Sequence, residues 1–317
     1  MTKCLYCAKE ILTDYYRGHE YHEKCSKQFY GVKIPPLLEY TQDDMEELAE
    51  KILKSSRVVT GVQPKLSLQK EKNPENRSEE RLTIVGLWGD YILKPQTKLY
   101  QELPELENAT MHLARAVRIN VLPNSLIRLK SGELAYITKR VDRLKKGKLH
   151  MEDMCQLTER QTEHKYKGSH EQIGKIIKKF SANSGFDLVN FYELVLFCFL
   201  TGNSDMHLKN FSLLKNIKKE YNLSPAYDLL ASTLVVKEDD EELALNLNGK
   251  KKKIKRKDLV TAMKTNGINE KAIENIFRKF EDIQSTWMNL IKTSFLSEDM
   301  KTNYLELIDT RLQKIFA

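Results

Sequence analysis

The sequence predicts a two-lobed α+β protein, with a mainly β front lobe and a helical back lobe. Several short strand-like runs bounded by turn residues lie within residues 58–93, and two more lie within residues 126–138. Beyond them the apolar side chains mostly recur at helical spacing. Runs of strands followed by runs of helices are typical of α+β folds. We therefore expect lobes at residues 40–140 and 141–317, with a cleft where they meet.

The elements of the front lobe follow from local periodicity and turn residues. Residues 41–54 predict a helix, because apolar side chains recur at helical spacing and acidic residues fill the first turn. Residues 102–117 predict a second helix on the same grounds. The predicted strands are residues 58–62, 65–68, 82–85 and 91–93, with a hairpin of residues 126–129 and 135–138. The charged stretch at residues 70–81 is interpreted as an exposed loop.

The back lobe is predicted to be helical on both sides of a long loop. The predicted helices are residues 152–157, 172–180 and 188–201, and helices again fill the chain from residue 257 to its end. Residues 202–228 are rich in turn-forming and polar side chains and predict a loop. Residues 242–247 have leucine at every second position, which predicts a strand.

The composition is that of a soluble globular protein, with 41% hydrophobic and 30% charged residues. The longest apolar run, residues 191–200, is too short to cross a bilayer, which takes about 20 residues. No apolar signal segment is visible, so we expect the protein in the cytoplasm. The net charge of +8 favours an anionic partner such as ATP, tRNA or an acidic protein surface. The basic run at residues 250–257 is interpreted as a solvated turn or helix face, with nucleic-acid contact as the alternative.

Residues 1–31 form a short unit whose cysteines and histidines have the spacing of a metal site. The candidate ligands are Cys4, Cys7, His22 and Cys25, in the pattern Cys-x2-Cys-x14-His-x2-Cys. Three thiolates and one imidazole suit a tetrahedral structural Zn²⁺. His19 is an alternative fourth ligand, and a small hydrophobic cap with vestigial ligands is the alternative interpretation. Cys155 and Cys198 lie in apolar surroundings and are predicted to be core thiols.

The most informative segment is the polar stretch of residues 201–214, which follows an apolar helix. It contains Asp205 and Asn210, five residues apart, with Lys209 between them, and Asp228 follows further along the chain. A kinase needs such a set, because one Asp orients the attacking hydroxyl and accepts its proton. An Asn and a second Asp then hold Mg²⁺, a cation that prefers oxygen ligands.

The front lobe contains the partners that this chemistry would need. Lys94 follows a strand and is placed to reach phosphate oxygens, and Glu107 on the next helix is placed to pair with it. The Gly turn at residues 60–65 would bring backbone N–H groups close to phosphate. Each feature is common by chance. Their order along the chain, however, predicts phosphoryl transfer.

Several strings of the sequence, in order, resemble HipA-type serine/threonine kinases. The strings are GVQPKLSL (61–68), YILKP (91–95), LPELENATMHLARAVRI (103–119), YITKRVDR (136–143), HMEDMCQL (150–157), GNSDMHLKNFSLL (202–214) and SPAYDLL (224–230). They span about residues 55–260, and the last two together are very specific. The resemblance implies a two-lobed protein-kinase-like fold, preceded here by the Cys/His unit with its zinc-knuckle-like spacing.

By position, the resemblance assigns a role to each matched residue. Asp205 would be the catalytic base, Lys94 would contact ATP phosphates with Glu107 holding it, and Asn210 and Asp228 would hold Mg²⁺. Residues 139–141 would form the hinge beside adenine. The implied nucleotide contacts are Thr60, Gly61, Val62, Gln63, Lys65, Lys94, Lys139, Val141, His207, Lys209, Asn210, Tyr227 and Asp228.

The resemblance also implies a toxin of a HipBA- or HipBST-type toxin–antitoxin system. Family members phosphorylate serine or threonine in proteins, with aminoacyl-tRNA synthetases as the type of target, and so arrest growth and favour persistence. The implied antitoxin is a HipB-like helix-turn-helix protein, and DNA would be reached only through it. The chain resembles the short HipT-like branch, so a separate HipS-like small protein is a further expected partner.

Two departures from the family pattern concern the nucleotide site. The family often has serine before the Gly turn, where autophosphorylation switches the kinase off, and this chain has Thr60, with Ser55 and Ser56 nearby. A phosphate there would repel ATP, so we expect inhibitory autophosphorylation at Thr60. The hinge has Lys139 where an acidic residue is common, which alters the adenine contact.

Two other functions fit parts of the sequence. The chain could be a catalytically silent kinase-fold regulator that binds nucleic acid or an antitoxin, although it keeps all of its predicted catalytic residues. A small-molecule or lipid kinase is the second alternative, because phosphoryl-transfer residues do not specify the acceptor. No amphipathic membrane helix stands out in the sequence, which disfavours a lipid substrate.

Overall fold

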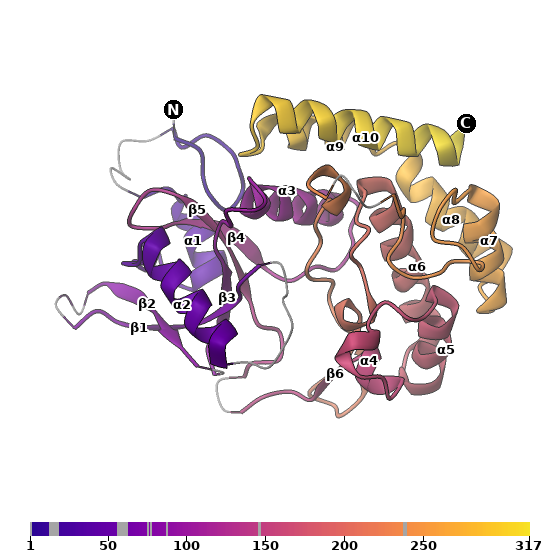
Figure 1. Ribbon diagram of the computed structural model, residues 1–317, viewed down its shortest axis with the longest axis horizontal. Helices are drawn as coiled ribbons and strands as arrows, with labels where there is room; N and C mark the ends of the chain where they lie inside the picture. The colour runs from indigo at the N-terminus through magenta and orange to yellow at the C-terminus, as the bar shows by residue number, and fades with distance from the viewer. Residues whose placement is uncertain are drawn as a thin grey trace. The chain divides into compact units, whose positions relative to one another are not determined.

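The structure is a computed structural model that describes most of the chain (Figure 1). The described residues are 2–12, 19–55, 63–74, 76, 78–86, 88–144, 147–236 and 240–317. They fall into two compact units, which we call the sheet unit and the helical unit. The sheet unit is Met1–Asn108, Leu122–Arg140 and Thr293–Phe295, and the helical unit is Ala109–Val121, Val141–Lys292 and Leu296–Ala317.

The sheet unit is built on a five-stranded antiparallel sheet with the order β2-β1-β3-β5-β4 (Figure 1). The strands are β1 (Leu66–Lys72), β2 (Glu80–Val85), β3 (Tyr91–Lys94), β4 (Asn124–Arg128) and β5 (Leu134–Lys139). β3 lies in the middle of the sheet, paired with β1 on one side and β5 on the other. Its last residue, Lys94, lies opposite Tyr136. Lys94 therefore belongs to a strand that has a hydrogen-bonded neighbour on each side.

Most predicted strands of the front lobe are confirmed, but the interpretation of residues 70–81 as a loop is wrong. β1 continues to Lys72, which pairs with Glu80 at the start of β2, so only residues 73–79 connect the strands. Lys70 forms an ion pair with Glu80 at 2.7 Å. The charges therefore mark the solvated face of a hairpin, where opposite charges pair across strands. The predicted strand at residues 58–62 lies outside the described residues.

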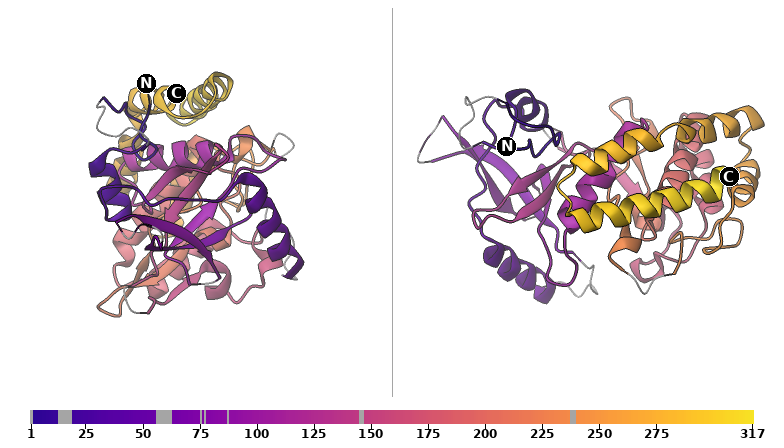
Figure 2. Two further views of the ribbon diagram at one scale, coloured as in Figure 1. Left: turned by 90° about the vertical axis from the view of Figure 1, so that its left-hand side faces the viewer. Right: turned by 90° about the horizontal axis from the view of Figure 1, so that it is seen from above.

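Two helices pack beside the sheet (Figure 2): α1 (Glu23–Tyr30) and α2 (Gln42–Ser55), the latter confirming the helix predicted at residues 41–54. Phe29 and Tyr30 at the end of α1 are buried, and each ring lies 5.9 Å, centroid to centroid, from the ring of Tyr91 in β3. The described part of the Cys/His unit thus shares one hydrophobic core with the sheet.

The helical unit combines a group of helices with a small sheet. Its helices are α4 (Met154–Leu157), α5 (His170–Phe180), α6 (Ser184–Thr201), α7 (Arg256–Thr265), α8 (Glu270–Glu281), α9 (Gln284–Thr293) and α10 (Glu298–Phe316), and α3 (Leu103–Ala116) contributes its second half. The small antiparallel sheet has the order β6 (Met151–Asp153), β7 (Ser212–Lys215), β8 (Tyr221–Leu223). α9 and α10 lie side by side (Figure 2), and Gln284 of α9 donates a hydrogen bond to Asp309 of α10.

α6 is the central helix of the helical unit and packs with α5, α8 and α10. By length and composition it would be able to cross a membrane, with a mean hydropathy of 1.3 over 18 residues, but 67% of that stretch is buried in the protein. A helix that is apolar all round is typical of the core of a large domain. Cys198 of α6 and Cys155 of α4 are buried, which confirms that they are core thiols.

Three predictions for the back lobe need correction. The helix predicted at residues 152–157 starts as strand β6, and the loop predicted at residues 202–228 contains β7 and β8. The strand predicted at residues 242–247 is wrong. That segment makes only isolated bridges, from Asn246 to Ser169 and from Leu247 to Lys250. Its alternation has another cause, because its leucines are buried without a neighbouring strand among the described residues.

Gly202 ends α6 and begins the polar loop predicted to carry the site. It adopts the left-handed conformation, with φ = 68°, and its N–H bonds to carbonyls of the last turn. A Cβ atom at this position would lie 2.6 Å from Leu307 Cδ2 and closer still to Thr233 Oγ1. Both the backbone conformation and the close packing therefore require glycine.

We expect Gly202→Ala to lower the free energy of unfolding by more than the roughly 1–2 kcal/mol that a left-handed alanine costs, because the added methyl group also clashes. Gly185→Ala is the matched control. Gly185 lies in the same helix with nothing within 4 Å of a Cβ, so that variant should match or exceed the wild type. Urea unfolding of the full chain measures both, and a Gly202→Ala protein as stable as the control would contradict this account.

Candidate functional site

In the sheet unit, Lys94 and Glu107 form a buried ion pair, as the sequence predicted. Lys94 Nζ lies 2.6 Å from Oε1 and 2.8 Å from Oε2 of Glu107, so both carboxylate oxygens accept from one ammonium. Lys94 is 4% exposed and Glu107 is 2% exposed. Nζ also lies 5.3 Å from the ring centroid of Tyr136, within the range of a cation–π contact. Sequence reasoning did not identify Tyr136, which the pairing of β5 with β3 places there.

The end of the Gly turn is only partly described. Gln63 donates from Nε2 to the backbone oxygen of Pro95, 2.9 Å away and next to Lys94, and Lys65 is exposed. The predicted nucleotide contacts Thr60, Gly61 and Val62 lie outside the described residues. The structure therefore places one end of this turn beside the Lys94 strand.

In the helical unit, the loop after α6 brings Asp205, His207 and Asn210 together. A short 3-10 helix, Leu208–Asn210, follows His207, and the N–H of His207 donates to the backbone oxygen of Asp205 at 2.8 Å. Asn210 Nδ2 donates to the same oxygen at 3.5 Å. The Asp205 carboxylate is exposed and accepts from the hydroxyl of Tyr166 at 2.5 Å. The loop thus presents a carboxylate to solvent, while hydrogen bonds within the loop hold its backbone.

His207 is buried beside two carboxylates. Burial lowers its pKa to about 4, while the charges of Asp205 and Asp228 act in the opposite direction, which places both carboxylates near this ring. Tyr166 packs edge-on against the ring at 5.1 Å between centroids. Because its pKa is so low, His207 is neutral at physiological pH and adds no positive charge to the loop.

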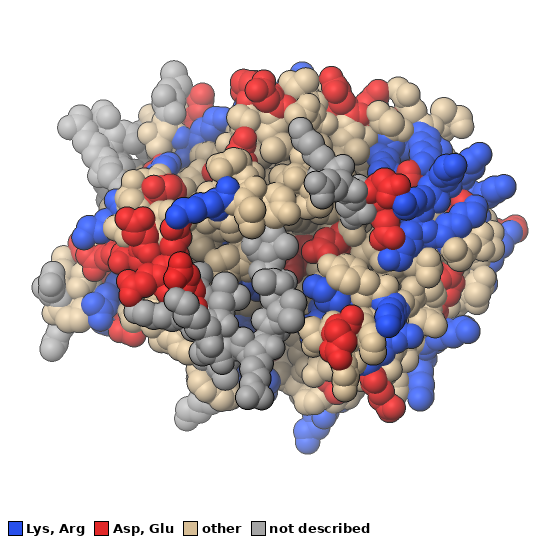
Figure 3. Space-filling model, viewed as in Figure 1, with Lys and Arg blue, Asp and Glu red and all other residues tan. Residues whose placement is uncertain are grey.

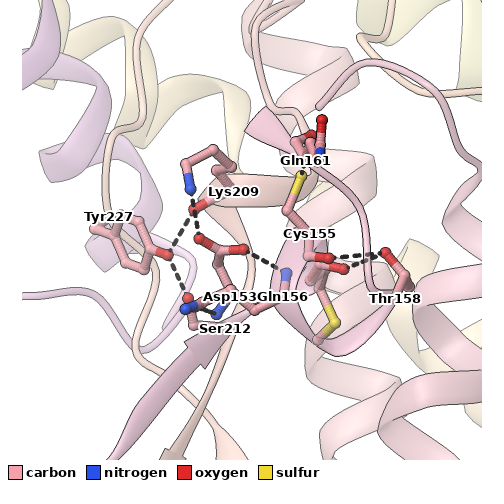
Figure 4. A network of polar contacts seen from close by, with 9 residues as sticks. Asp153, Cys155, Gln156, Thr158, Gln161, Lys209, Ser212 and Tyr227 are labelled. Atoms are coloured by element: carbon pink, nitrogen blue, oxygen red, sulfur yellow. Dashed lines mark hydrogen bonds and ion pairs between the residues drawn. The ribbon is translucent and has the colours of Figure 1, made fainter. Parts of the chain in front are cut away.

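Tyr227 and Lys209 belong to a second, connected network (Figure 4). The hydroxyl of Tyr227 donates to the backbone oxygen of Lys209 at 3.0 Å and lies 2.6 Å from Ser212 Oγ. Lys209 Nζ in turn forms an ion pair with Asp153 at 2.8 Å. Asp153 also caps α4, since its side chain accepts from the N–H of Gln156. This network ties the loop to β6, β7 and α4.

Asp228 follows Tyr227 in a strained backbone conformation, with φ = 60°. A non-glycine residue in the left-handed region is uncommon, and such residues gather at functional sites, where the surrounding structure holds them. Its side chain is half-buried, and its charge acts to raise the pKa of His207, as does that of Asp205. We call the residues linked by these contacts and charges the helical cluster: Asp205, His207, Lys209, Asn210, Tyr227 and Asp228.

Lys139 and Val141 fall on the two sides of the division between the units, since the sheet unit ends at Arg140 and the helical unit resumes at Val141. Lys139 is the last residue of β5 and lies opposite Tyr91. Burial lowers the pKa of Lys139. The hinge residues predicted from the family likeness thus lie at one of the points where the chain passes from one unit to the other, and their contact with adenine stays a prediction.

Sequence reasoning missed three residues that contact the helical cluster. Asp153 had a detectable signal, because Asp followed by Gln three residues later is the pattern of a helix capping box, which the structure contains. Tyr166 and Ser212 had no such signal. Their roles depend on the tertiary placement of an exposed side chain and of a strand that was predicted as loop.

The basic run at residues 250–257 is partly neutralised by acidic neighbours. Lys250 pairs with Asp258 at 2.8 Å, Lys251 pairs with Glu241 at 3.0 Å, and Lys252 pairs with Asp240. Figure 3 shows lysines and arginines gathered on the side of the helical unit where α7 and α8 lie. The pairing fits the interpretation of this run as a solvated turn.

The fold and these residues are those of a kinase-like α+β protein, and the comparisons with known proteins agree with this class. A family model described as the HipA-like C-terminal domain matches residues 58–287. The chain therefore belongs to this family, as the sequence strings predicted.

Curated relatives and solved structures point the same way. The chain is 35% identical over 206 residues to "Putative kinase Y4dM" of Sinorhizobium fredii, which covers 61% of this chain and 49% of that protein. It is 29% identical over 185 residues to a "Putative kinase" of Haemophilus influenzae, with 55% and 52% covered. The chain thus spans about half the length of these curated relatives.

Two solved structures share the fold. The complex of HipA, HipB and operator DNA from Shewanella oneidensis contains a chain that matches with a TM-score of 0.70 and 19% identity, covering 96% of this chain and 80% of that chain. The proinflammatory kinase CtkA of Helicobacter pylori matches with a TM-score of 0.54 and 17% identity, covering 78% and 93%. The predicted two-lobed α+β kinase fold is thereby confirmed.

We expect Lys94→Met to lower the free energy of unfolding by about 3–5 kcal/mol, because it leaves the Glu107 carboxylate buried without its partner. The double variant Lys94→Met/Glu107→Leu should regain most of this loss, since it buries neither charge. Denaturant unfolding of the single and double variants gives the coupling free energy.

An exposed ion pair of similar length is the matched control. Lys264 and Glu270 lie 2.7 Å apart with side chains 51% and 79% exposed, so Lys264→Met should cost less than about 1 kcal/mol. Strictly additive losses at Lys94 and Glu107 would contradict the account of the buried pair.

Proposed function

We propose that this chain is an ATP- and Mg²⁺-dependent protein kinase that phosphorylates serine or threonine. The buried Lys94–Glu107 pair carries the proposal. Burying an ammonium and a carboxylate costs more than an apolar pair of similar volume would, so fold stability gives little reason to keep them. Kinases use such a strand lysine, held by a helix glutamate, to contact the phosphates of ATP.

The helical cluster supplies the remaining groups that phosphoryl transfer needs. Asp205 would accept the proton of the attacking hydroxyl, and its exposed carboxylate is oriented by Tyr166 at 2.5 Å. Asn210 and Asp228 would hold Mg²⁺, since an amide and a carboxylate oxygen are ligands that this hard cation prefers. Mg²⁺, when bound, neutralises charge on the transferring phosphoryl group.

The remaining proposed nucleotide contacts come from both units. From the sheet unit they are Thr60, Gly61, Val62, Gln63, Lys65 and Lys139, and from the helical unit Val141, His207, Lys209 and Tyr227. Because burial keeps His207 neutral at physiological pH, its imidazole would offer a hydrogen bond or a stacking surface rather than a charge. The ammonium of Lys94 would meet the phosphates.

We further propose that the kinase is a cytoplasmic toxin with a HipB-like antitoxin partner. The support is membership of the HipA-like family and the fold shared with a HipA that was solved with HipB and operator DNA. DNA contact through the antitoxin, a HipS-like partner and an aminoacyl-tRNA synthetase as substrate are proposed on the family likeness alone. Autophosphorylation is proposed at Thr60, where phosphate would repel ATP.

We expect Asp205→Asn and Asp228→Asn each to lower phosphotransfer from labelled ATP to proteins of a host lysate by at least about 10²–10⁴-fold. The first change removes the proton acceptor, and the second removes a charged metal ligand. Asp282→Asn, at an exposed position after α8 of the same unit, should keep full activity. Phosphoamino-acid analysis of the labelled band identifies the acceptor.

Circular dichroism and thermal unfolding of each variant separate a lost site from a lost fold. Full activity of a folded Asp205→Asn or Asp228→Asn protein would overturn the site assignment. Label found on lipid or on a small molecule instead of protein would overturn the proposed substrate class.

A further inference from the structure

The Cys/His cluster near the N-terminus takes no part in the proposed phosphoryl transfer and precedes the family match at residues 58–287. The structure brings one potential ligand atom from each of Cys4, Cys7, His22 and Cys25 to within 4.8 Å of all the others. Cys4 is fully buried and the other three are half-buried. Four soft or borderline donors thus converge on one small volume at the edge of the sheet unit.

The distances between these atoms fit a tetrahedral metal site. Tetrahedral Zn²⁺ with bonds of roughly 2.3 Å to sulfur and 2.1 Å to nitrogen separates its sulfur and nitrogen ligands by about 3.6 Å. His22 Nδ1 lies 3.4 Å from Cys7 Sγ and 3.7 Å from Cys25 Sγ. These two nitrogen–sulfur distances lie on either side of the separation that a tetrahedral Zn²⁺ would impose.

The hydrogen bonds of His22 select the nitrogen that faces the thiols. Its Nε2 lies 3.0 Å from the backbone oxygen of Glu10. A carbonyl oxygen only accepts hydrogen bonds, so Nε2 carries the proton and Nδ1 presents its lone pair to Cys7 and Cys25. Metal-bound histidines almost always donate their second ring N–H in this way, which fixes the ring and the tautomer.

The backbone around the cysteines is folded as a tight turn that presents sulfur. Cys4 and Lys9 are hydrogen-bonded, and the N–H of Ala8 donates to the oxygen of Cys4 at 2.8 Å. Ala8 adopts φ = 58°, an unfavourable left-handed conformation for alanine, directly after Cys7. The N–H of His22 points to Cys4 Sγ at 3.4 Å, an interaction that stabilises a thiolate. A mere hydrophobic cap would require neither the strained turn nor a backbone donor aimed at sulfur.

We propose that Cys4, Cys7, His22 and Cys25 bind one structural Zn²⁺ that fastens the N-terminal segment to the sheet. All four coordination positions are filled by the protein, so the site has no open position for a substrate. Three cysteines bind as thiolates and release their protons to solvent, and His22 binds as the neutral imidazole. His19, the alternative ligand in the sequence, is not part of the cluster that the structure forms.

The segment organised by these ligands covers an edge strand. The backbone N–H of Leu126 in β4 donates to the oxygen of Leu5 at 3.1 Å, next to Cys4. Tyr21, next to His22, donates its hydroxyl to the oxygen of Leu126. β4 is the last strand of the sheet order, and an uncovered edge would present unpaired backbone groups. The same ion would hold α1, whose Phe29 packs on Tyr91 in the strand that ends at Lys94.

The test is metal analysis of the full chain purified without added chelator. We expect about one zinc per chain by inductively coupled plasma mass spectrometry. His22→Ala and Cys25→Ser should lower zinc affinity by more than the 10–100-fold that loss of an outer partner costs, measured by competition with a chromogenic chelator. Cys155→Ser, which changes a buried thiol of the helical unit, should hold zinc like the wild type.

A ligand-preserving variant separates metal binding from folding. His22→Cys should keep zinc, because it offers a fourth thiolate one bond closer to the backbone than Nδ1. Substitution of Co²⁺ into the wild type should give thiolate charge-transfer bands and the visible bands of a tetrahedral ion, and removal of metal should lower the thermal midpoint.

Three results would overturn the proposal. They are a wild-type chain that is free of zinc and melts identically with and without added Zn²⁺, a bound metal other than zinc, and unchanged zinc content in folded His22→Ala and Cys25→Ser proteins. A disulfide among these cysteines in the native protein would also overturn the proposal, because it would remove thiolates that the metal needs. None of these outcomes bears on phosphotransfer by the Asp205 loop.

Discussion

The burial of α6 is the constraint on which the helical unit depends. Most of its side chains from Leu188 onward are apolar and buried, and burying each large one stabilises the fold by about 1.5–3 kcal/mol. The helix therefore cannot shift along its axis without exposing apolar surface. The polar loop begins at Gly202, directly after the last buried turn, so the starting point of Asp205 and Asn210 is fixed by hydrophobic packing.

The corresponding constraint in the sheet unit is the burial of the Lys94 ammonium in one fixed orientation. Lys94 ends the central strand of the sheet, where it pairs with Tyr136 of β5, and its neighbour Leu93 pairs with β1 on the other side. Its side chain is held by both oxygens of Glu107 and by the face of Tyr136. Under the proposed function, a charge that is already desolvated and oriented would lose little freedom on meeting a phosphate, which is the advantage of a preorganised site.

Much of this arrangement could be predicted from the sequence. The family strings and helical periodicity gave the order of elements, and the Lys94–Glu107 pairing followed from a strand and a helix in sequence. The predictions failed where long-range pairing decides the structure. β7 and β8 have few residues and polar turns around them, and they are strands only because β7 pairs with β6 on one side and with β8 on the other. At residues 242–247 the error was the reverse, since a strand was predicted where none forms. Leucines packed into the helical unit give the same sequence pattern as a strand.

Side-chain networks were the least predictable part of the site. Tyr166 is separated from Asp205 by the whole of α5 and α6 along the chain, and its hydroxyl reaches the carboxylate only because the fold returns the chain to that point. A local sequence motif predicts contacts only among its own few residues. A hydrogen bond between residues far apart in the sequence therefore cannot be predicted from the sequence around either of them.

The shared core of α1 and the sheet has a consequence for how the protein is divided. Family likeness starts at residue 58, whereas the packing that covers Tyr91 and Leu126 starts with Leu5 and Phe29. A shortened chain cut at the homology limit would expose an aromatic cluster and a bare strand edge, which are the features that promote aggregation. In this protein the family match and the hydrophobic core of the sheet unit have different borders.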